Sequence, residues 1–265
     1  MTTRPLLLAS TVGCAVFASQ AAYADVKFVS VAAAAEAYTE AWNGITDNPK
    51  SDFKSKTAQA NKLAKAMTGI DASAIASSSS GGNNRNASAA DTERATVKLA
   101  SKFDADLDFG GYVYASVTSK AGPEATAGAG GSLSFAGYEF RTTSPELLSI
   151  DYTTQSDFDA DNAYELVVLR GKNRPVATEY FIDANASDSI FLDLTKGFYT
   201  VAVYLYQPDD VAAGVGQAIA GSYSGDFHVT LSAVPEASTW VMIGAGFGAL
   251  GAFSAARRRK AGASA

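Results

Sequence analysis

Apolar and polar residues alternate with a period of two through most of the second half of the chain. Within 102–119, Phe103, Leu107 and Phe109 fall on one side of an extended chain, and the aspartates between them fall on the other. This pattern is typical of a strand with one buried face and one wet face. Short segments rich in β-branched and aromatic residues follow at 131–143, 146–154, 163–171, 177–184, 188–194, 198–206 and 225–233. We therefore predict a mainly β fold over 94–233, an antiparallel β-sandwich with a jelly-roll-like arrangement.

The connections between these segments carry turn residues. Leu194–Phe198, with the sequence Leu-Thr-Lys-Gly-Phe, predicts a hairpin between 188–194 and 198–206, and 171–174 predicts another hairpin turn. The stretch 121–131 is rich in glycine and alanine, which predicts a flexible loop between strands.

The first part of the chain has a different pattern. After a short predicted strand at 25–31, apolar residues recur at helical intervals in 32–45 and 51–70. The run of Ser, Gly and Asn at 77–91 has little apolar area to bury, which predicts a mobile linker. We expect residues 25–93 to form a short helical segment followed by this linker.

Residues 1–24 have the pattern of a secretory signal peptide. Arg4 precedes an apolar run that ends in Ala22-Tyr23-Ala24, so we expect cleavage after Ala24. A retained anchor and lipidation at Cys14 remain alternatives. Cys14 is the sole cysteine, so a chain cleaved after Ala24 has no disulfide, no thiolate metal ligand and no thiol nucleophile.

The charge distribution argues against nucleic acid as a partner. The formal net charge is −6, but five of the 21 cationic residues lie in the terminal segments, whereas all 27 acidic residues lie between those segments. The middle of the chain is therefore more acidic than the total suggests, and it should repel phosphate groups.

A calcium loop is the metal site that we consider. Asp157, Asp159 and Asp161 lie between two predicted strands and could surround a hard cation with oxygen ligands. The glycine and glutamate of an EF-hand loop are absent there, and a solvated acidic turn is the default interpretation. Asp104, Asp106 and Asp108 also alternate, but we expect them to occupy the wet face of a strand. Calcium is thus the candidate cofactor, and we predict no other.

Catalytic signals are weak, and we predict that the protein is not an enzyme. His228 is the sole histidine, and its alternation with Phe227 and Val229 favours the polar face of a strand. No Gly-x-Ser-x-Gly elbow is present to hold a nucleophilic serine. Two tyrosine pairs, Tyr112 with Tyr114 and Tyr204 with Tyr206, each share one sheet face. They could stack on sugars or belong to the core.

The C-terminal part combines an apolar run with a basic stop. Residues 239–256 carry no charge and would measure about 27 Å as a helix, which is barely enough to cross a hydrocarbon core of about 30 Å. The cations that follow should stay in the cytoplasm, so the rest of the chain would lie outside. The basic stop consists of Arg257, Arg258, Arg259 and Lys260.

A short motif precedes this run, and the three parts together resemble the PEP-CTERM sorting signal at 234–260. The matching residues are Val234, Pro235, Glu236, Ser238, Thr239 and Trp240, whereas Ala237 replaces the second proline of the family pattern. The resemblance implies that exosortase, a membrane-embedded transpeptidase-like enzyme, processes the chain in a Gram-negative bacterium that makes exopolysaccharide. It implies a temporary membrane anchor, followed by location at the cell surface or in the extracellular matrix.

These inferences lead to an expected function. We expect a secreted, surface-sorted structural or adhesive protein of the exopolysaccharide matrix, with exosortase, the membrane and exopolysaccharide as partners. The alternative is a carbohydrate- or calcium-binding β-sandwich module.

Overall fold

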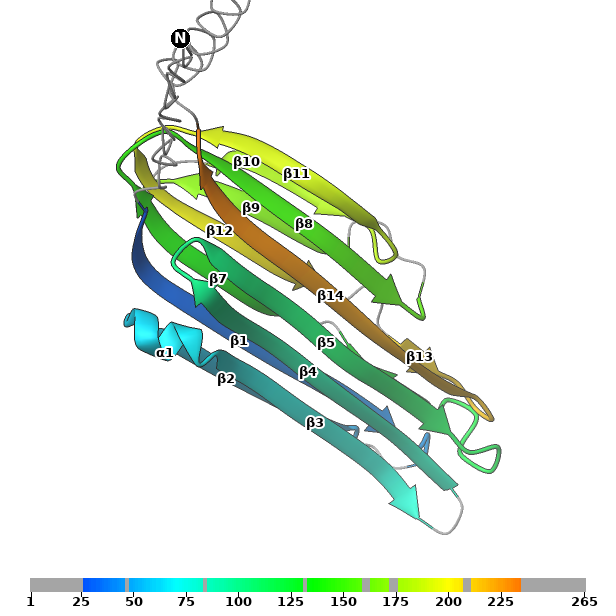
Figure 1. Ribbon diagram of the computed structural model, residues 1–265. Coiled ribbons are helices and arrows are strands. Elements are labelled where there is room, and N and C mark those ends of the chain that lie inside the picture. Colours follow the sequence, from blue (N-terminus) through cyan, green and yellow to red (C-terminus); the bar gives the residue numbers. More distant parts are fainter. Residues whose placement is uncertain are drawn as a thin grey trace, which may run out of the picture.

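Two antiparallel β-sheets pack face to face in the computed structural model (Figure 1). The structure describes residues 26–45, 48–82, 85–130, 133–158, 163–171, 176–206 and 211–234. The elements are β1 (Val26–Trp42), β2 (Lys50–Ala60), α1 (Leu63–Met67), β3 (Ile70–Gly82), β4 (Arg85–Ser101), β5 (Asp104–Val117), β6 (Thr126–Ala129), β7 (Leu133–Thr142), β8 (Glu146–Ser156), β9 (Tyr164–Arg170), β10 (Val176–Ile182), β11 (Ser187–Leu194), β12 (Gly197–Tyr206), β13 (Val211–Ala213) and β14 (Ala218–Ala233).

The strands divide between an eight-stranded sheet and a six-stranded sheet. The eight-stranded sheet has the order β10-β9-β12-β7-β1-β6-β13, with β2 paired to β1 off this path. The six-stranded sheet has the order β11-β8-β14-β5-β4-β3. The last strand, β14, ends at Ala233, directly before the predicted sorting signal.

The period-two pattern places the core between the sheets. In β12, Tyr199, Val201, Val203 and Leu205 are buried, and in β14 Phe227 and Val229 are buried in the same way. The prediction of a mainly β fold with antiparallel sheets is confirmed, whereas the jelly-roll-like arrangement stays a prediction.

The two helices predicted at 32–45 and 51–70 are wrong. β1 and β2 run through these residues and pair with each other over Val31–Ala41 and Lys50–Ala60, and the helical part is limited to α1. The cause is the alanine content of β1. Because alanines occupy both faces of β1, with Ala33 and Ala35 inside and Ala32 and Ala34 outside, composition hides the alternation. Burial in a sheet then overrides the helix propensity of alanine.

The mobile linker predicted at 77–91 is also wrong. β3 and β4 form a continuous antiparallel hairpin whose register runs from Ile70 opposite Val97 to Gly82 opposite Arg85. Small side chains explain why this polar stretch is ordered. Ala76 and Ala87 are fully buried, so the alanines of this stretch supply the apolar face that packs in the core.

The connection Leu194–Phe198 is not a hairpin. β11 pairs with β8 in the six-stranded sheet, whereas β12 pairs with β7 and β9 in the eight-stranded sheet. Thr142 of β7 fixes the connection that leads from one sheet to the other. Its hydroxyl donates to the Thr195 carbonyl at 2.8 Å and accepts from the Gly197 amide at 3.0 Å. The loop predicted at 121–131 contains the short strand β6, which pairs with β1.

Candidate functional site

The outer face of the six-stranded sheet carries a row of acidic side chains around the sole histidine. Asp106 on β5 and Asp151 on β8 both lie opposite His228 on β14, one on each side. One row further along, Asp108 lies opposite Asp226. The aspartates of β5 and His228 thus occupy the polar face, as their alternation predicts.

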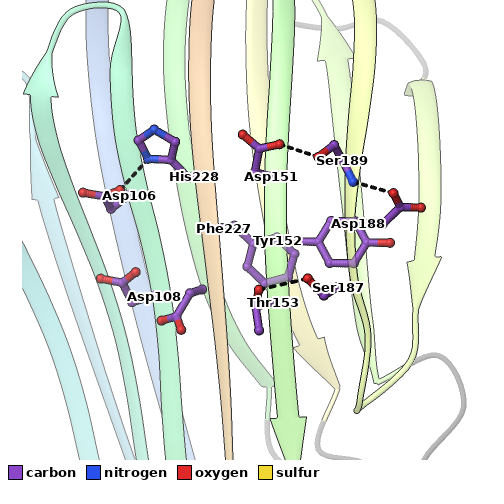
Figure 2. A pocket seen from close by; sticks show the side chains of 11 residues that line it. Asp106, Asp108, Asp151, Tyr152, Thr153, Ser187, Asp188, Ser189, Phe227 and His228 are labelled. Carbon is purple, nitrogen blue, oxygen red and sulfur yellow. Dashed lines mark hydrogen bonds and ion pairs between the residues drawn. The ribbon is translucent and has the colours of Figure 1, made fainter.

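His228 is paired with Asp106 of β5 (Figure 2), and Asp104 of the same strand lies close by. The imidazole Nδ1 lies 2.7 Å from Oδ1 of Asp106 and 3.7 Å from Oδ1 of Asp104. The hydrogen bond to Asp106 raises the pKa of His228 above its ordinary value, and the charges of Asp104, Asp106 and Asp151 act in the same direction. Partial burial opposes these effects. The pair therefore favours the protonated imidazole.

A shallow groove of 310 Å³ opens beside this pair. Asp108, Asp151, Asp188 and Asp226 contribute carboxylates to its wall, and Ser189 donates its hydroxyl to Asp151 at 2.5 Å. Burial raises the pKa of Asp108, while a hydrogen bond from Thr96 partly offsets the rise. Such a groove attracts cations and hydrogen-bond donors and repels anions.

Asp104, Asp106 and His228 could act together as metal ligands. One ligand atom from each lies within 4.8 Å of the others. Two carboxylate oxygens and one imidazole nitrogen suit a divalent transition metal better than calcium, which prefers oxygen alone. However, each of these side chains is 35–45% exposed. An ordinary histidine–aspartate ion pair without a metal would show the same contacts.

Little in the sequence predicts this cluster. Asp106 and His228 are 122 residues apart, and the register between β5 and β14 brings them together. The available signal is weak: an Asp-x-Asp-x-Asp strand and a histidine on a second strand, both with polar outer faces.

The predicted calcium loop lies mostly outside the described residues. Asp159 and Asp161 belong to this undescribed stretch, whereas Asp157 is described. Its carboxylate accepts hydrogen bonds from the backbone amide and the hydroxyl of Ser222, both at 2.8 Å. These bonds lower the pKa of Asp157 and fix the start of the loop to β14. Calcium binding there remains a prediction.

The two tyrosine pairs lie on outer faces of the sandwich. Tyr112 is 45% exposed and Tyr114 is half-buried on β5, while Tyr206 is 45% exposed and Tyr204 is half-buried on β12. The core positions between them belong to other residues, such as Val113 and Leu205. Of the two interpretations, an outward surface is the one that the structure supports.

The predicted sorting signal follows the last strand. Val234 is its described residue, and the Val234 amide donates to the Pro145 carbonyl at 3.5 Å. The other signal residues lie outside the described part: Pro235, Glu236, Ser238, Thr239, Trp240, Arg257, Arg258, Arg259 and Lys260. The predicted transmembrane helix at 239–256 lies there too. Within the described residues, no helix has the length and apolar character needed to cross a membrane.

Comparison with known proteins identifies a motif in the C-terminal part of the chain. Residues 233–260 match the family model of the PEP-CTERM protein-sorting motif, whereas no curated protein and no solved structure shows significant similarity. This motif is the recognition signal for exosortase, which means that the protein is exported and processed at the membrane. The chain is therefore a protein with a PEP-CTERM sorting motif at residues 233–260.

Proposed function

We propose that this protein is a non-catalytic structural or adhesive component of the exopolysaccharide matrix of a Gram-negative bacterium. A signal peptide at 1–24 starts its export, and a helix at 239–256 holds it in the membrane until exosortase acts. The observation that carries the proposal is the sorting motif, which begins where β14 ends. Because β14 ends at the motif, processing would deliver the sandwich as a unit.

Fractionation of the native host tests this role. The measurement is the amount of protein in washed matrix and in the medium, detected with an antibody against the sandwich. We expect matrix retention in the parent strain and release into the medium in a strain that makes no exopolysaccharide. Equal release from both strains would contradict the matrix role and leave exosortase-dependent sorting intact.

A carbohydrate- or calcium-binding module is the second candidate function. The outward position of the tyrosine pairs favours sugar binding, because an exposed aromatic ring offers a flat apolar surface with a polar edge. A glycan array probed with the protein separates a binding module from a purely structural protein.

Calcium binding at Asp157, Asp159 and Asp161 has a direct test. A bound cation stabilises the folded state, so the melting temperature should be higher in calcium than in chelator. Substitution of Asp159 and Asp161 with asparagine should abolish the difference. Identical melting curves of the unsubstituted protein in calcium and in chelator would rule out the loop as a site.

A further inference from the structure

The outer face of the eight-stranded sheet carries a row of aromatic side chains. Tyr204 on β12 lies opposite Phe135 on β7, and their ring centroids are 5.1 Å apart at an interplanar angle of 45°. On the other side, Tyr204 lies opposite Glu165 of β9, which lies opposite Phe181 of β10. The row therefore crosses four neighbouring strands. We call Phe135, Tyr204, Tyr206 and Phe181 the aromatic row.

Glycine shapes the surface of this row. A Cβ atom added at Gly137 would lie 2.6 Å from Cζ of Phe135, so the far end of the Phe135 ring covers Gly137. The ring consequently lies along the sheet instead of standing away from it. Ala202, another small residue, lies opposite Gly137 and leaves room beside the ring. Phe135 and Tyr204 therefore form a tilted pair of rings close to the sheet.

Carboxylates border the same surface. The Tyr206 hydroxyl donates to Glu165, and this hydrogen bond raises the pKa of Tyr206 to about 12. Glu179 hydrogen-bonds to Glu165 and has a raised pKa for that reason. Phe181 is 59% exposed at the end of the row. The rings are thus mixed with hydrogen-bond acceptors that carry negative charge.

The negative charge of Glu165 and Glu179 limits which kind of partner can bind to the aromatic row. A second copy that docked through the same surface about a two-fold axis near Glu165 would bring the two Glu165–Glu179 pairs together, which like-charge repulsion opposes. An anionic lipid surface is disfavoured for the same reason. A neutral hexose chain offers C–H faces for the rings and hydroxyl donors for the carboxylates, so it complements both features of the surface.

We propose that the aromatic row is a binding site for neutral polysaccharide. A hexose ring stacks on Phe135 and Tyr204, and its hydroxyl groups donate to Glu165. Tyr206 holds Glu165 in position, and Phe181 contacts a further sugar of the same chain. This inference rests on the proposed matrix function and names the surface through which the protein contacts the polysaccharide.

Affinity electrophoresis of the mature protein, purified from its host, provides the test. The gels contain hydroxyethylcellulose, dextran or neutral exopolysaccharide from the host as probes, and alginate as an anionic probe. We expect retardation by at least one neutral probe. The Phe135→Ala/Tyr204→Ala double variant should raise the dissociation constant for it about tenfold or more, because aromatic anchors dominate such surfaces.

Two further variants make the result specific. Phe191→Ala removes an exposed ring from β11, on the outer face of the other sheet, and should change the dissociation constant less than about twofold. Gly137→Ala displaces the Phe135 ring but keeps all four rings, so it should weaken binding to the neutral probe. Melting curves for each variant confirm that it is folded.

Several results would overturn the proposal. They are no retardation by any neutral probe, retardation by alginate alone, or unchanged binding in a folded double variant. Self-association that is lost in the double variant, measured by sedimentation, would assign the row to a second copy instead. These outcomes are independent of the matrix fractionation, which tests the location of the protein and not this surface.

Discussion

At the scale of single residues, the charge of His228 depends on its two carboxylate neighbours. Asp106 forms the hydrogen bond at 2.7 Å, and this contact is the largest cause of the raised pKa. We expect Asp106→Asn to lower the pKa of His228. Because the chain has one histidine, a proton NMR titration follows its imidazole without ambiguity. Asp188→Asn is the control, since Asp188 lines the same groove without contacting the imidazole.

The same contact makes stability depend on pH. The pKa of His228 is raised above 6.5, so its contribution is fully present below that value and is lost as the pH rises through the raised pKa. Asp106→Asn should therefore lower the melting temperature more at about pH 5 than at about pH 9. The effect should be small, because 45% of the imidazole is exposed. An equal loss at both pH values would show that the pair contributes no proton-linked stability.

Adjacent glycines on β5 have different roles. A Cβ atom at Gly111 would lie 2.0 Å from the Tyr223 hydroxyl, whereas one at Gly110 would have its nearest neighbour 3.9 Å away. Tyr223 is buried and donates to the buried Glu93, so it has little room to move. Gly111→Ala should lower the free energy of unfolding by about 1–3 kcal/mol. Urea denaturation measures this loss, and Gly110→Ala should change the value by less than about 0.5 kcal/mol.

At the scale of elements, the sequence predicts strands well where β-branched and aromatic residues alternate with polar ones. β8, β9 and β12 are such strands, and their predicted ranges are close to the observed ones. β1, β3 and β4 escape prediction because alanine and serine on both faces weaken the alternation. The sequence also does not predict which strands pair with each other. The register that brings Asp106 to His228, or Tyr204 to Phe135, joins distant segments, and no local pattern specifies it.

The hairpin of β3 and β4 can be tested against the mobile linker that the sequence predicts there. The sequence favours a mobile linker at 77–91, whereas the structure pairs β4 with β3 on one edge and β5 on the other. Amides of β4 should therefore exchange with deuterium slowly. Those of β2, which pairs with β1 alone among the described strands, should exchange faster. Mass spectrometry of peptides from both strands provides the measurement, and β4 amides that exchange at the rate of an unfolded chain would contradict the hairpin.

At the scale of the whole molecule, the two outer faces have different chemistry. One carries the acidic groove around His228, and the other carries the aromatic row with Glu165. The core between them is mostly apolar on both sheets, with a few buried polar side chains such as Glu93. The end of β14 joins this sandwich directly to the sorting motif. Recognition by exosortase must therefore occur within a few residues of the folded sandwich, since Val234 already contacts Pro145.

Processing at this junction is the prediction that concerns the whole chain. A permanent anchor requires an apolar length and flanking charge, and neither requirement explains Pro235 and Glu236. Proline keeps the chain out of a helix, and the glutamate offers a charge for an enzyme to recognise. We expect the mature protein from a host with exosortase to lack residues 257–265, as measured by mass spectrometry. Glu236→Ala should leave the full-length form in the membrane, whereas Glu124→Ala, at an exposed position of the sandwich, should be processed normally. If intact protein ending at Ala265 accumulates equally with and without exosortase, the C-terminal segment is a plain membrane anchor.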